Sequence, residues 1–261
     1  MTASDVARAA ALVRDALGHH PAGLMTDLDG TLSPIVGDPS AVALAAGARD
    51  VLARLAERLA VVGIITGRAA ADAREISALP ELLVIGNHGV EWLDPGATRA
   101  RVGMDSSQVA ALLRSALAGL SAEPGLVLDE KGLSAAVHYR NAAQPAQARE
   151  RILAALAHLP DGLELREGRL SVELRPIGGG DKGTALREVV ERYELRGLVV
   201  AGDDVTDLDM FRAATELRAA GNLAAAIVAV GGSGEVPAAV ALAADVTVDS
   251  PDELVAVLSG V

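Results

Sequence analysis

Short apolar runs recur along the chain, and each stops at polar residues. The run at 59–65 has almost no polar alternation, which is typical of a strand buried on both faces of a parallel sheet. Turn residues bound the other runs in the same way. The strands predicted from these runs span residues 22–27, 59–65, 82–85, 198–201, 225–230 and 245–248.

In the segments between these strands, apolar residues recur at the spacing of an α-helix. Ser250 and Pro251 followed by two acidic residues are typical of a helix start, and Asp181 is a candidate N-cap. Strands that alternate with helices indicate an α/β fold with a doubly wound, Rossmann-like parallel sheet. The helices predicted for this core span residues 4–17, 45–57, 69–77, 181–193, 206–214 and a last segment from 250.

The middle of the chain has a different rhythm. A helix beginning at Ser106 or Ser107, two strand-like runs, a second helix and two further runs follow one another. This order is typical of a small α+β domain with an antiparallel sheet and two helices. We therefore expect a core domain of residues 1–98 and 176–261, with an inserted α+β cap domain of residues 99–175. The elements predicted for the cap are helices 106–120 and 144–158 and strands 125–129, 133–139, 163–166 and 169–174.

Two carboxylates follow the first predicted strand. Asp27 and Asp29 are separated by one residue and lie beyond a strand end, which is where open α/β sheets bind ligands. Carboxylates this close repel one another and need a cation or a shared proton. A turn in which both aspartates accept backbone N–H groups would explain this stretch equally well if it stood alone.

Lys182 stands in the first turn of a predicted helix. A cation there opposes the helix dipole at a cost of roughly 0.3–1 kcal/mol, so an anion should compensate. The candidates are a phosphoryl group and the Asp27 carboxylate. The alternative is a solvated lysine that pairs with Asp181 or Glu188.

Acidic residues are dense after the strand at 198–201. Asp203, Asp204, Asp207 and Asp209 lie within seven residues, and their mutual repulsion favours a bound cation. Because the donors are carboxylate oxygens and the chain has no cysteine, Mg²⁺ is the expected metal.

Composition narrows the setting. Apolar residues make up 51% of the 261 residues but aromatic residues only 2%, so the core must be built from Ala, Leu and Val. A chain without cysteine has no disulfides, and a reducing cytoplasm is the simplest location. The net charge of −12 argues against a nucleic-acid partner. Charges at Asp5, Arg8 and Arg14 interrupt any signal-peptide core, and no apolar stretch of about 20 residues predicts a membrane span.

Four motifs resemble, in the right order, those of the haloacid dehalogenase superfamily of phosphohydrolases. They are Asp27-Leu28-Asp29-Gly30-Thr31, Thr66-Gly67-Arg68, Asp181-Lys182-Gly183 and Gly202-Asp203-Asp204-Val205-Thr206-Asp207. Within that superfamily the chain resembles the trehalose-6-phosphate phosphatases over nearly its whole length after about residue 22. The stretches that carry this closer resemblance are Thr31–Ile35, Gly86–Gly89, His138–Arg140 and Val172–Pro176.

The resemblance implies a role for each core motif. Asp27 would be the nucleophile that forms an aspartyl-phosphate, and Asp29 the general acid that later acts as a base. Thr66 would hydrogen-bond a phosphate oxygen, although a threonine ending a strand before a glycine is common without any function. Lys182 would contact the phosphoryl group. Asp203 would bind Mg²⁺ together with Asp27 and the backbone carbonyl of Asp29.

Further residues follow from the same resemblance. Gly67 and Arg68 would bind substrate. Asp207 would support the loop or Lys182, and Asp204 either binds the metal through water or caps the helix at Thr206. The family's usual glutamate after the fourth motif is Leu208 here, which leaves no catalytic role vacant.

The cap would bind the sugar, because recognition of a disaccharide needs many hydrogen bonds to its hydroxyl groups. For His138, a structural role in the cap sheet is about as well supported as a contact with the sugar. Asn87 and His88, in a core loop, are also expected to contact the substrate. The cap residues expected to bind substrate are Lys131, His138, Arg140, Glu173 and Arg175.

These expectations favour a Mg²⁺-dependent phosphatase that converts trehalose 6-phosphate to trehalose and phosphate. The second hypothesis is a phosphatase for sucrose phosphate or mannosylglycerate phosphate. A remote third hypothesis is a receiver module, which has an acidic pocket and signals without turnover. The expected partner is a small sugar phosphate, with a trehalose-6-phosphate synthase in the same pathway, and neither nucleic acid nor membrane.

Overall fold

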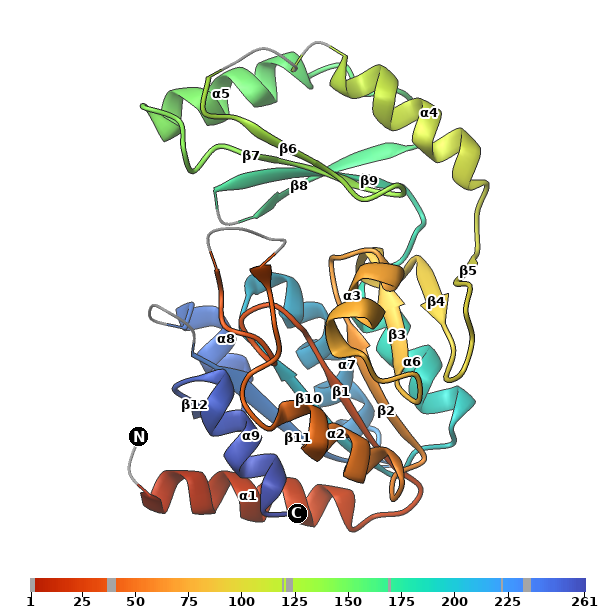
Figure 1. Cartoon of the computed structure of the whole chain (residues 1–261), viewed down its shortest axis with the longest axis vertical. Helices are drawn as coiled ribbons and strands as arrows, with labels where there is room; N and C mark the ends of the chain where they lie inside the picture. Colours follow the sequence, from red (N-terminus) through yellow and green to blue (C-terminus); the bar gives the residue numbers. More distant parts are fainter. Residues whose placement is uncertain are drawn as a thin grey trace. The chain divides into compact units, whose positions relative to one another are not determined.

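The computed structural model describes residues 3–36, 41–118, 120, 124–168, 170–221, 223–231 and 236–261. It divides into two compact units, which Figure 1 shows in the colours of the sequence. The larger unit comprises Met1–Arg101 and Asp181–Val261, and the smaller unit comprises Val102–Gly180. The boundaries expected from the sequence, after residues 98 and 175, lie three and five residues earlier.

An eight-stranded sheet in the order β12-β11-β10-β1-β2-β3-β4-β5 forms the centre of the larger unit. The strands from β12 to β3 run parallel, and β4 joins β3 in antiparallel orientation. The parallel α/β core predicted from the apolar runs is confirmed, whereas β4 and β5 were not predicted. The strands are β1 (Ala22–Thr26), β2 (Val61–Ile65), β3 (Leu83–Gly86), β4 (Glu91–Leu93), β5 (Arg101–Val102), β10 (Gly197–Gly202), β11 (Ala224–Val230) and β12 (Val246–Val248).

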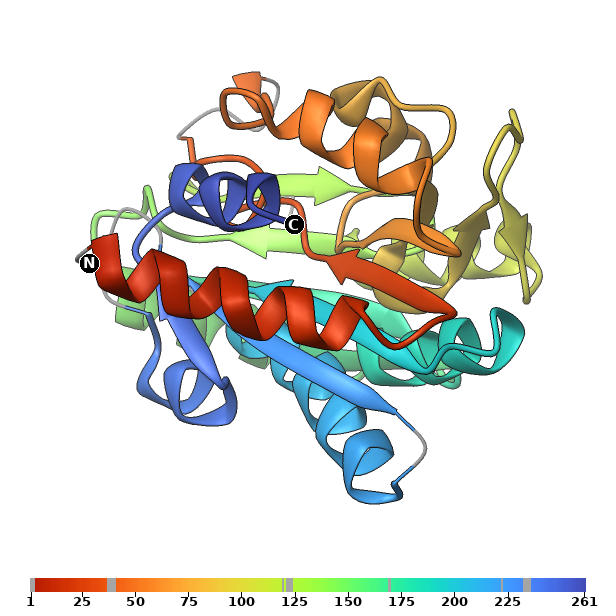
Figure 2. The ribbon, with the colours of Figure 1, turned by 90° about the horizontal axis from the view of Figure 1, so that it is seen from below.

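Helices cover both faces of this sheet. One apolar cluster joins a face to α1 (Ala3–Leu17), α2 (Ala48–Ala56), α3 (Ala70–Ser77) and α9 (Pro251–Ser259). A second cluster joins the other face to α6 (Lys182–Arg192), α7 (Leu208–Ala219) and α8 (Ala238–Ala243). Figure 2 shows α1 and α9 side by side in the first layer. Among the described residues, no helix is long and apolar enough to cross a membrane.

Local capping explains where several helices begin. Asp181 accepts the N–H of Thr184 at 2.7 Å, and Ser250 accepts that of Glu253 at 3.2 Å, so both expected caps are confirmed. The expected start of α4 (Ser106–Leu117) at Ser106 or Ser107 is confirmed. The carboxylate of Asp105 accepts the first free N–H groups of that helix and is therefore its N-cap.

The smaller unit is a four-stranded antiparallel sheet in the order β6-β7-β9-β8. Its two helices lie on one side of the sheet in Figure 1. Along β9 the buried Val172 and Leu174 alternate with Glu173 and Arg175, so one face is apolar and the other is charged. The predicted α+β arrangement is confirmed. Besides α4 its elements are β6 (Val127–Glu130), β7 (Ala135–His138), α5 (Pro145–Ala155), β8 (Leu163–Gly168) and β9 (Ser171–Pro176).

Candidate active site

The sheet order brings distant sequence motifs to one edge. Strand β1 lies between β2 and β10, and the chain continues away from β1 in both directions, which makes this the switch point of the sheet. Asp27 follows β1, Thr66 follows β2 and Asp203 follows β10. Because the three strands are parallel, their polar ends meet at the same edge.

The loop after β1 is held tightly to its neighbours. The N–H of Asp27 donates to the carbonyl of Ala201 at 2.9 Å, which continues the β1–β10 ladder one residue beyond the strand. Gly30 has a φ of 84°, and a Cβ there would lie 2.1 Å from a carboxylate oxygen of Asp203. Only glycine therefore fits this turn. The hydroxyl of Thr31 donates to Asp203 at 3.0 Å and joins the two loops.

Lys182 is buried at the centre of the site, with 2% of its surface exposed. Its Nζ donates to Oδ1 of Asp27 and to Oδ1 of Asp207, both at 2.7 Å. The fully buried Asp207 uses its other oxygen to accept the N–H groups of Asp203 and Asp204, at 2.9 and 3.1 Å. The expected alternative of a solvated lysine was wrong, because Lys182 pairs with two carboxylates in the interior.

Burial and charge shift the pKa values of these groups. Desolvation raises the pKa of Asp27 to about 7, although Lys182 opposes the shift. Desolvation, together with Asp27 and Asp207, raises the pKa of Asp203 to about 9. Burial alone would lower the pKa of Lys182, but the two carboxylates outweigh it and raise that pKa. The single ammonium of Lys182 therefore cannot neutralise all three of the carboxylates around it.

The carboxylates that converge here are suited to a cation. Oxygen atoms of Asp27, Asp203 and Asp207 lie within 4.8 Å of one another. Lys182 forms ion pairs with the first and the last of these, whereas within the described part of the chain no lysine or arginine forms an ion pair with Asp203. A hard divalent cation with oxygen ligands would supply the missing positive charge.

Asp29 is engaged differently. The guanidinium of Arg68 donates through Nε to Oδ2 of Asp29 at 2.7 Å and through Nη2 to Oδ1 at 2.8 Å. Arg68 follows Thr66, whose hydroxyl accepts the N–H of Arg68 at 3.2 Å. Sequence reasoning assigned Arg68 to the substrate, and its pairing with Asp29 was missed.

The loop after β3 supports the loop after β2. The N–H groups of Asn87 and His88 donate to the carbonyls of Arg68 and Thr66, at 2.8 and 2.9 Å. Both Asn87 and His88 are buried and have left-handed backbone angles, with φ of 47° and 58°. A Cβ on Gly67 would lie 2.5 Å from Nε2 of His88, so the imidazole occupies the space above that glycine. Non-glycine residues rarely adopt this conformation, and those that do cluster at active and ligand-binding sites.

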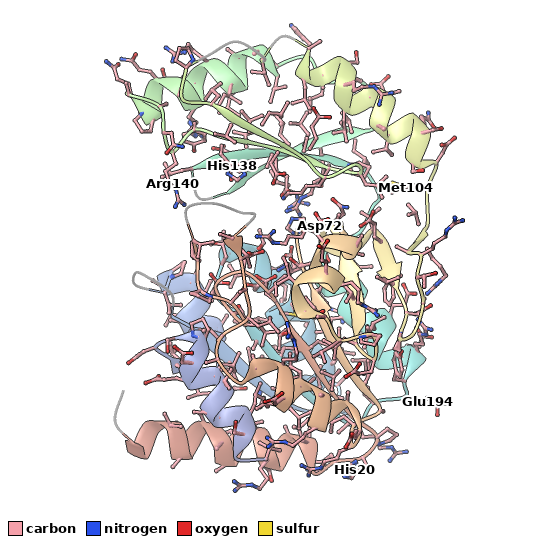
Figure 3. All side chains as sticks on the ribbon, in the orientation of Figure 1. His20, Asp72, Met104, His138, Arg140 and Glu194 are labelled. Atoms are coloured by element: carbon pink, nitrogen blue, oxygen red, sulfur yellow. The ribbon has the colours of Figure 1, made fainter. Side chains whose placement is uncertain are left out.

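Four of the five candidate residues of the smaller unit are linked through neighbouring polar side chains. Glu173 accepts Lys131 at 3.3 Å and Nε of Arg175 at 2.8 Å, and Arg175 adds a second N–H to the same carboxylate. Asp129, which sequence reasoning missed, lies 3.9 Å from both Lys131 and His138. Figure 3 labels His138 and the exposed Arg140 near the end of β7.

The sequence predicted two alternative roles for each of Asp204 and Asp207. Asp207 supports both the loop and Lys182, as its three hydrogen bonds show. Asp204 occupies the N-cap position of the short 3₁₀ helix Val205–Asp207 that precedes α7. This position agrees with the expected capping role.

A doubly wound core whose strand ends carry an Asp-x-Asp pair, a threonine, a buried lysine and an acidic loop defines a protein of the haloacid dehalogenase type. The model of the trehalose-phosphatase family matches residues 25–246. The chain belongs to this family.

Individual relatives agree with the family. A Mycobacterium avium protein named trehalose-phosphate phosphatase is 38% identical over 205 residues, which are 75% of this chain and 52% of the relative. The chain thus spans about half the length of the curated relatives it matches.

Two solved structures share the fold over almost the full length. The C-terminal domain of the Candida albicans trehalose-6-phosphate phosphatase has a TM-score of 0.76 at 21% identity, with 96% of both chains covered. An Aspergillus fumigatus trehalose-6-phosphate phosphatase has a TM-score of 0.63 at 26% identity, also with 96% of both chains covered.

Proposed function

We propose that this chain hydrolyses trehalose 6-phosphate to trehalose and phosphate, with Mg²⁺ as its metal. The observation that carries the proposal is the pairing of buried Lys182 with Asp27 beside two further carboxylates. Family membership and relatives named for this activity support it. The proposed setting is the cytoplasm, where a trehalose-6-phosphate synthase would supply the substrate.

The proposed reaction has two displacements at phosphorus. An oxygen of Asp27 bonds to phosphorus while the bond to the sugar oxygen breaks, and Asp29 gives that oxygen its proton. Asp29 then takes a proton from water, whose oxygen bonds to phosphorus and releases Asp27 as a carboxylate. Lys182 offsets charge on Asp27, and the Thr66 hydroxyl donates to a phosphoryl oxygen.

Mg²⁺ would supply positive charge for the phosphoryl oxygens and would keep Asp27 ionised. Asp27 and Asp203 are the proposed ligands, with the backbone carbonyl of Asp29. Their raised pKa values fit this assignment, because burial and mutual repulsion disfavour the carboxylate forms until a cation is present.

The smaller unit is proposed to act as a cap that binds the sugar. Lys131 and Arg175 orient the carboxylate of Glu173 from two sides, which prepares it to accept hydroxyl groups. His138 extends the same charged face of the sheet, and Arg140 follows it in the chain. Asn87 and His88 are proposed to contact substrate from the core.

Phosphate release from a panel of sugar phosphates tests the proposal. The panel holds trehalose 6-phosphate, sucrose phosphate and mannosylglycerate phosphate, each with Mg²⁺ and with excess EDTA. We expect trehalose 6-phosphate to have the highest kcat/KM, and chelation to abolish turnover. Preference for another sugar would refute the substrate, and full activity in EDTA would refute the metal. A stable phosphoprotein without turnover would indicate a receiver module.

A further inference from the structure

Arg68 and Asp29 form a two-pronged ion pair within the site. Each oxygen of the Asp29 carboxylate receives one N–H of the same guanidinium, at 2.7 and 2.8 Å. This planar geometry fixes the orientation of a carboxylate, which a single ammonium contact does not. The side chains are 19% and 37% exposed, so the pair lies where a ligand has access.

The three carboxylates that converge on one point do not include Asp29. Those of Asp27, Asp203 and Asp207 approach within 4.8 Å, although Asp29 is only two residues from Asp27. A divalent cation attracts every carboxylate that can reach it. Arg68 is the cation that engages Asp29 instead, and its loop is fixed by hydrogen bonds from Asn87 and His88.

We propose that Arg68 is a positioning residue for Asp29, which holds that carboxylate apart from the metal-binding carboxylates and thereby keeps it available for proton transfer. The inference rests on the proposed function, because it assumes that Asp29 exchanges a proton with the leaving group. It gives Arg68 a different role from the substrate contact that the family resemblance implies.

The chemistry explains why such a residue is needed. When the bond from phosphorus to the sugar oxygen breaks, the electron pair stays on that oxygen and the proton of Asp29 moves to it. A carboxylate drawn onto Mg²⁺ would lose the fixed orientation that proton transfer to the departing oxygen requires. The protonated carboxyl of Asp29 keeps an oxygen that accepts an N–H of Arg68 while its O–H donates to the leaving group, so Arg68 can fix its orientation during the transfer.

The first experiment compares Arg68→Ala and Arg68→Lys on two substrates that differ in their need for a proton. For Arg68→Ala we expect kcat on trehalose 6-phosphate to fall about 10- to 100-fold, which is part of the usual contribution of general acid catalysis. The first displacement on 4-nitrophenyl phosphate, whose leaving group needs no proton, is followed as the single-turnover release of 4-nitrophenol and should stay within about threefold. Arg68→Lys should also be impaired, because an ammonium lacks the fork.

Two controls separate positioning from a general structural effect. Added guanidinium should restore part of the sugar-phosphate turnover of Arg68→Ala and leave the single-turnover release of 4-nitrophenol unchanged. Arg187→Ala, which breaks an exposed ion pair with Glu216 on α6 and α7, should behave as the unchanged protein on both substrates. Equal losses in sugar-phosphate turnover and in the single-turnover release of 4-nitrophenol, with a raised KM, would overturn the proposal and assign Arg68 to phosphate binding.

The second experiment needs no turnover. Calorimetric titration with Mg²⁺ alone should show tighter binding to Arg68→Ala, by about three- to tenfold, because the freed Asp29 can approach the cation. The double variant Arg68→Ala, Asp29→Asn should lose this gain. Unchanged or weaker binding to Arg68→Ala would overturn the proposal, which requires both results.

The two experiments distinguish the failure of this inference from the failure of the proposed function. If the unchanged protein prefers another phosphate ester, the substrate assignment fails and the first experiment is done with that ester. If it hydrolyses no phosphate ester, the proposed function fails and the Mg²⁺ titration alone decides the role of Arg68.

Discussion

Replacing Lys182 by methionine should strongly destabilise the metal-free protein, and more at high pH than at low pH. Methionine keeps much of the volume but leaves Asp27, Asp203 and Asp207 facing one another without the ammonium. Removal of one partner from a buried ion pair costs about 3–5 kcal/mol. We expect a loss of that size at pH 8.

Protonation should limit the loss at lower pH. Without Lys182 the pKa of Asp27, already raised to about 7, rises further, so between pH 8 and pH 6 the folded variant binds on average about half a proton more than the unchanged protein. A group whose pKa is raised by folding contributes stability that is lost as the pH rises. The slope is about 1.4 kcal/mol per pH unit for one proton, so over two pH units the loss at pH 6 should be smaller by about 1.4 kcal/mol.

Urea unfolding in EDTA at pH 6 and pH 8 measures this difference. Arg187→Met on the same helix is the matched control, because its ion pair with Glu216 is exposed and should contribute at most about 1 kcal/mol. A Lys182→Met variant that lost no more than the control, or lost the same amount at both pH values, would refute the reasoning about charge in the site.

Other changes have equally specific outcomes. Because the pKa of Asp203 is raised to about 9, metal-free protein should melt at lower temperature as the pH rises from 5 to 9. Asp203→Asn should flatten this trend in a calorimeter, and a steep trend in the variant would contradict the assignment. Asp27→Asn should release no phosphate and show no covalent phosphorylation by mass spectrometry, and residual capture would point to another nucleophile. Glu173→Ala should lower kcat/KM for trehalose 6-phosphate by roughly 10- to 150-fold, taking one charge-assisted hydrogen bond. Its activity on 4-nitrophenyl phosphate should be unchanged, and equal losses would mean that Glu173 only supports the sheet.

Apolar runs predicted the parallel strands well, because a strand covered on both faces has little room for polar residues. The same logic overlooks β4 and β5, which are short and contain Glu91 and Arg101. Helix α8 was missed because Ala238–Ala243 carries neither a capping side chain nor an amphipathic pattern.

The site residues were found more readily than their contacts. The unfavourable place of Lys182 in a helix start indicated an anionic partner, but the contact with Asp27 spans 155 residues and follows only from the sheet order. The pair of Arg68 with Asp29 was missed for the same reason, since neither residue has a local signal that names the other. Asp129 could have been found from its alternation on β6, which puts it on the charged face of the antiparallel sheet.

The insertion of the smaller unit has a consequence for folding. Ala22 of β1 pairs with Gly197 of β10, a separation of 175 residues, of which the 79 residues Val102–Gly180 belong to that unit. Loop-closure entropy grows only with the logarithm of length, at about 0.6 kcal/mol for each doubling, so the insertion adds roughly that amount. The edge of the sheet that carries the candidate site therefore tolerates a longer or shorter insert at almost constant thermodynamic cost. The distant β1–β10 contact should instead slow folding, because long-range pairing sets the rate.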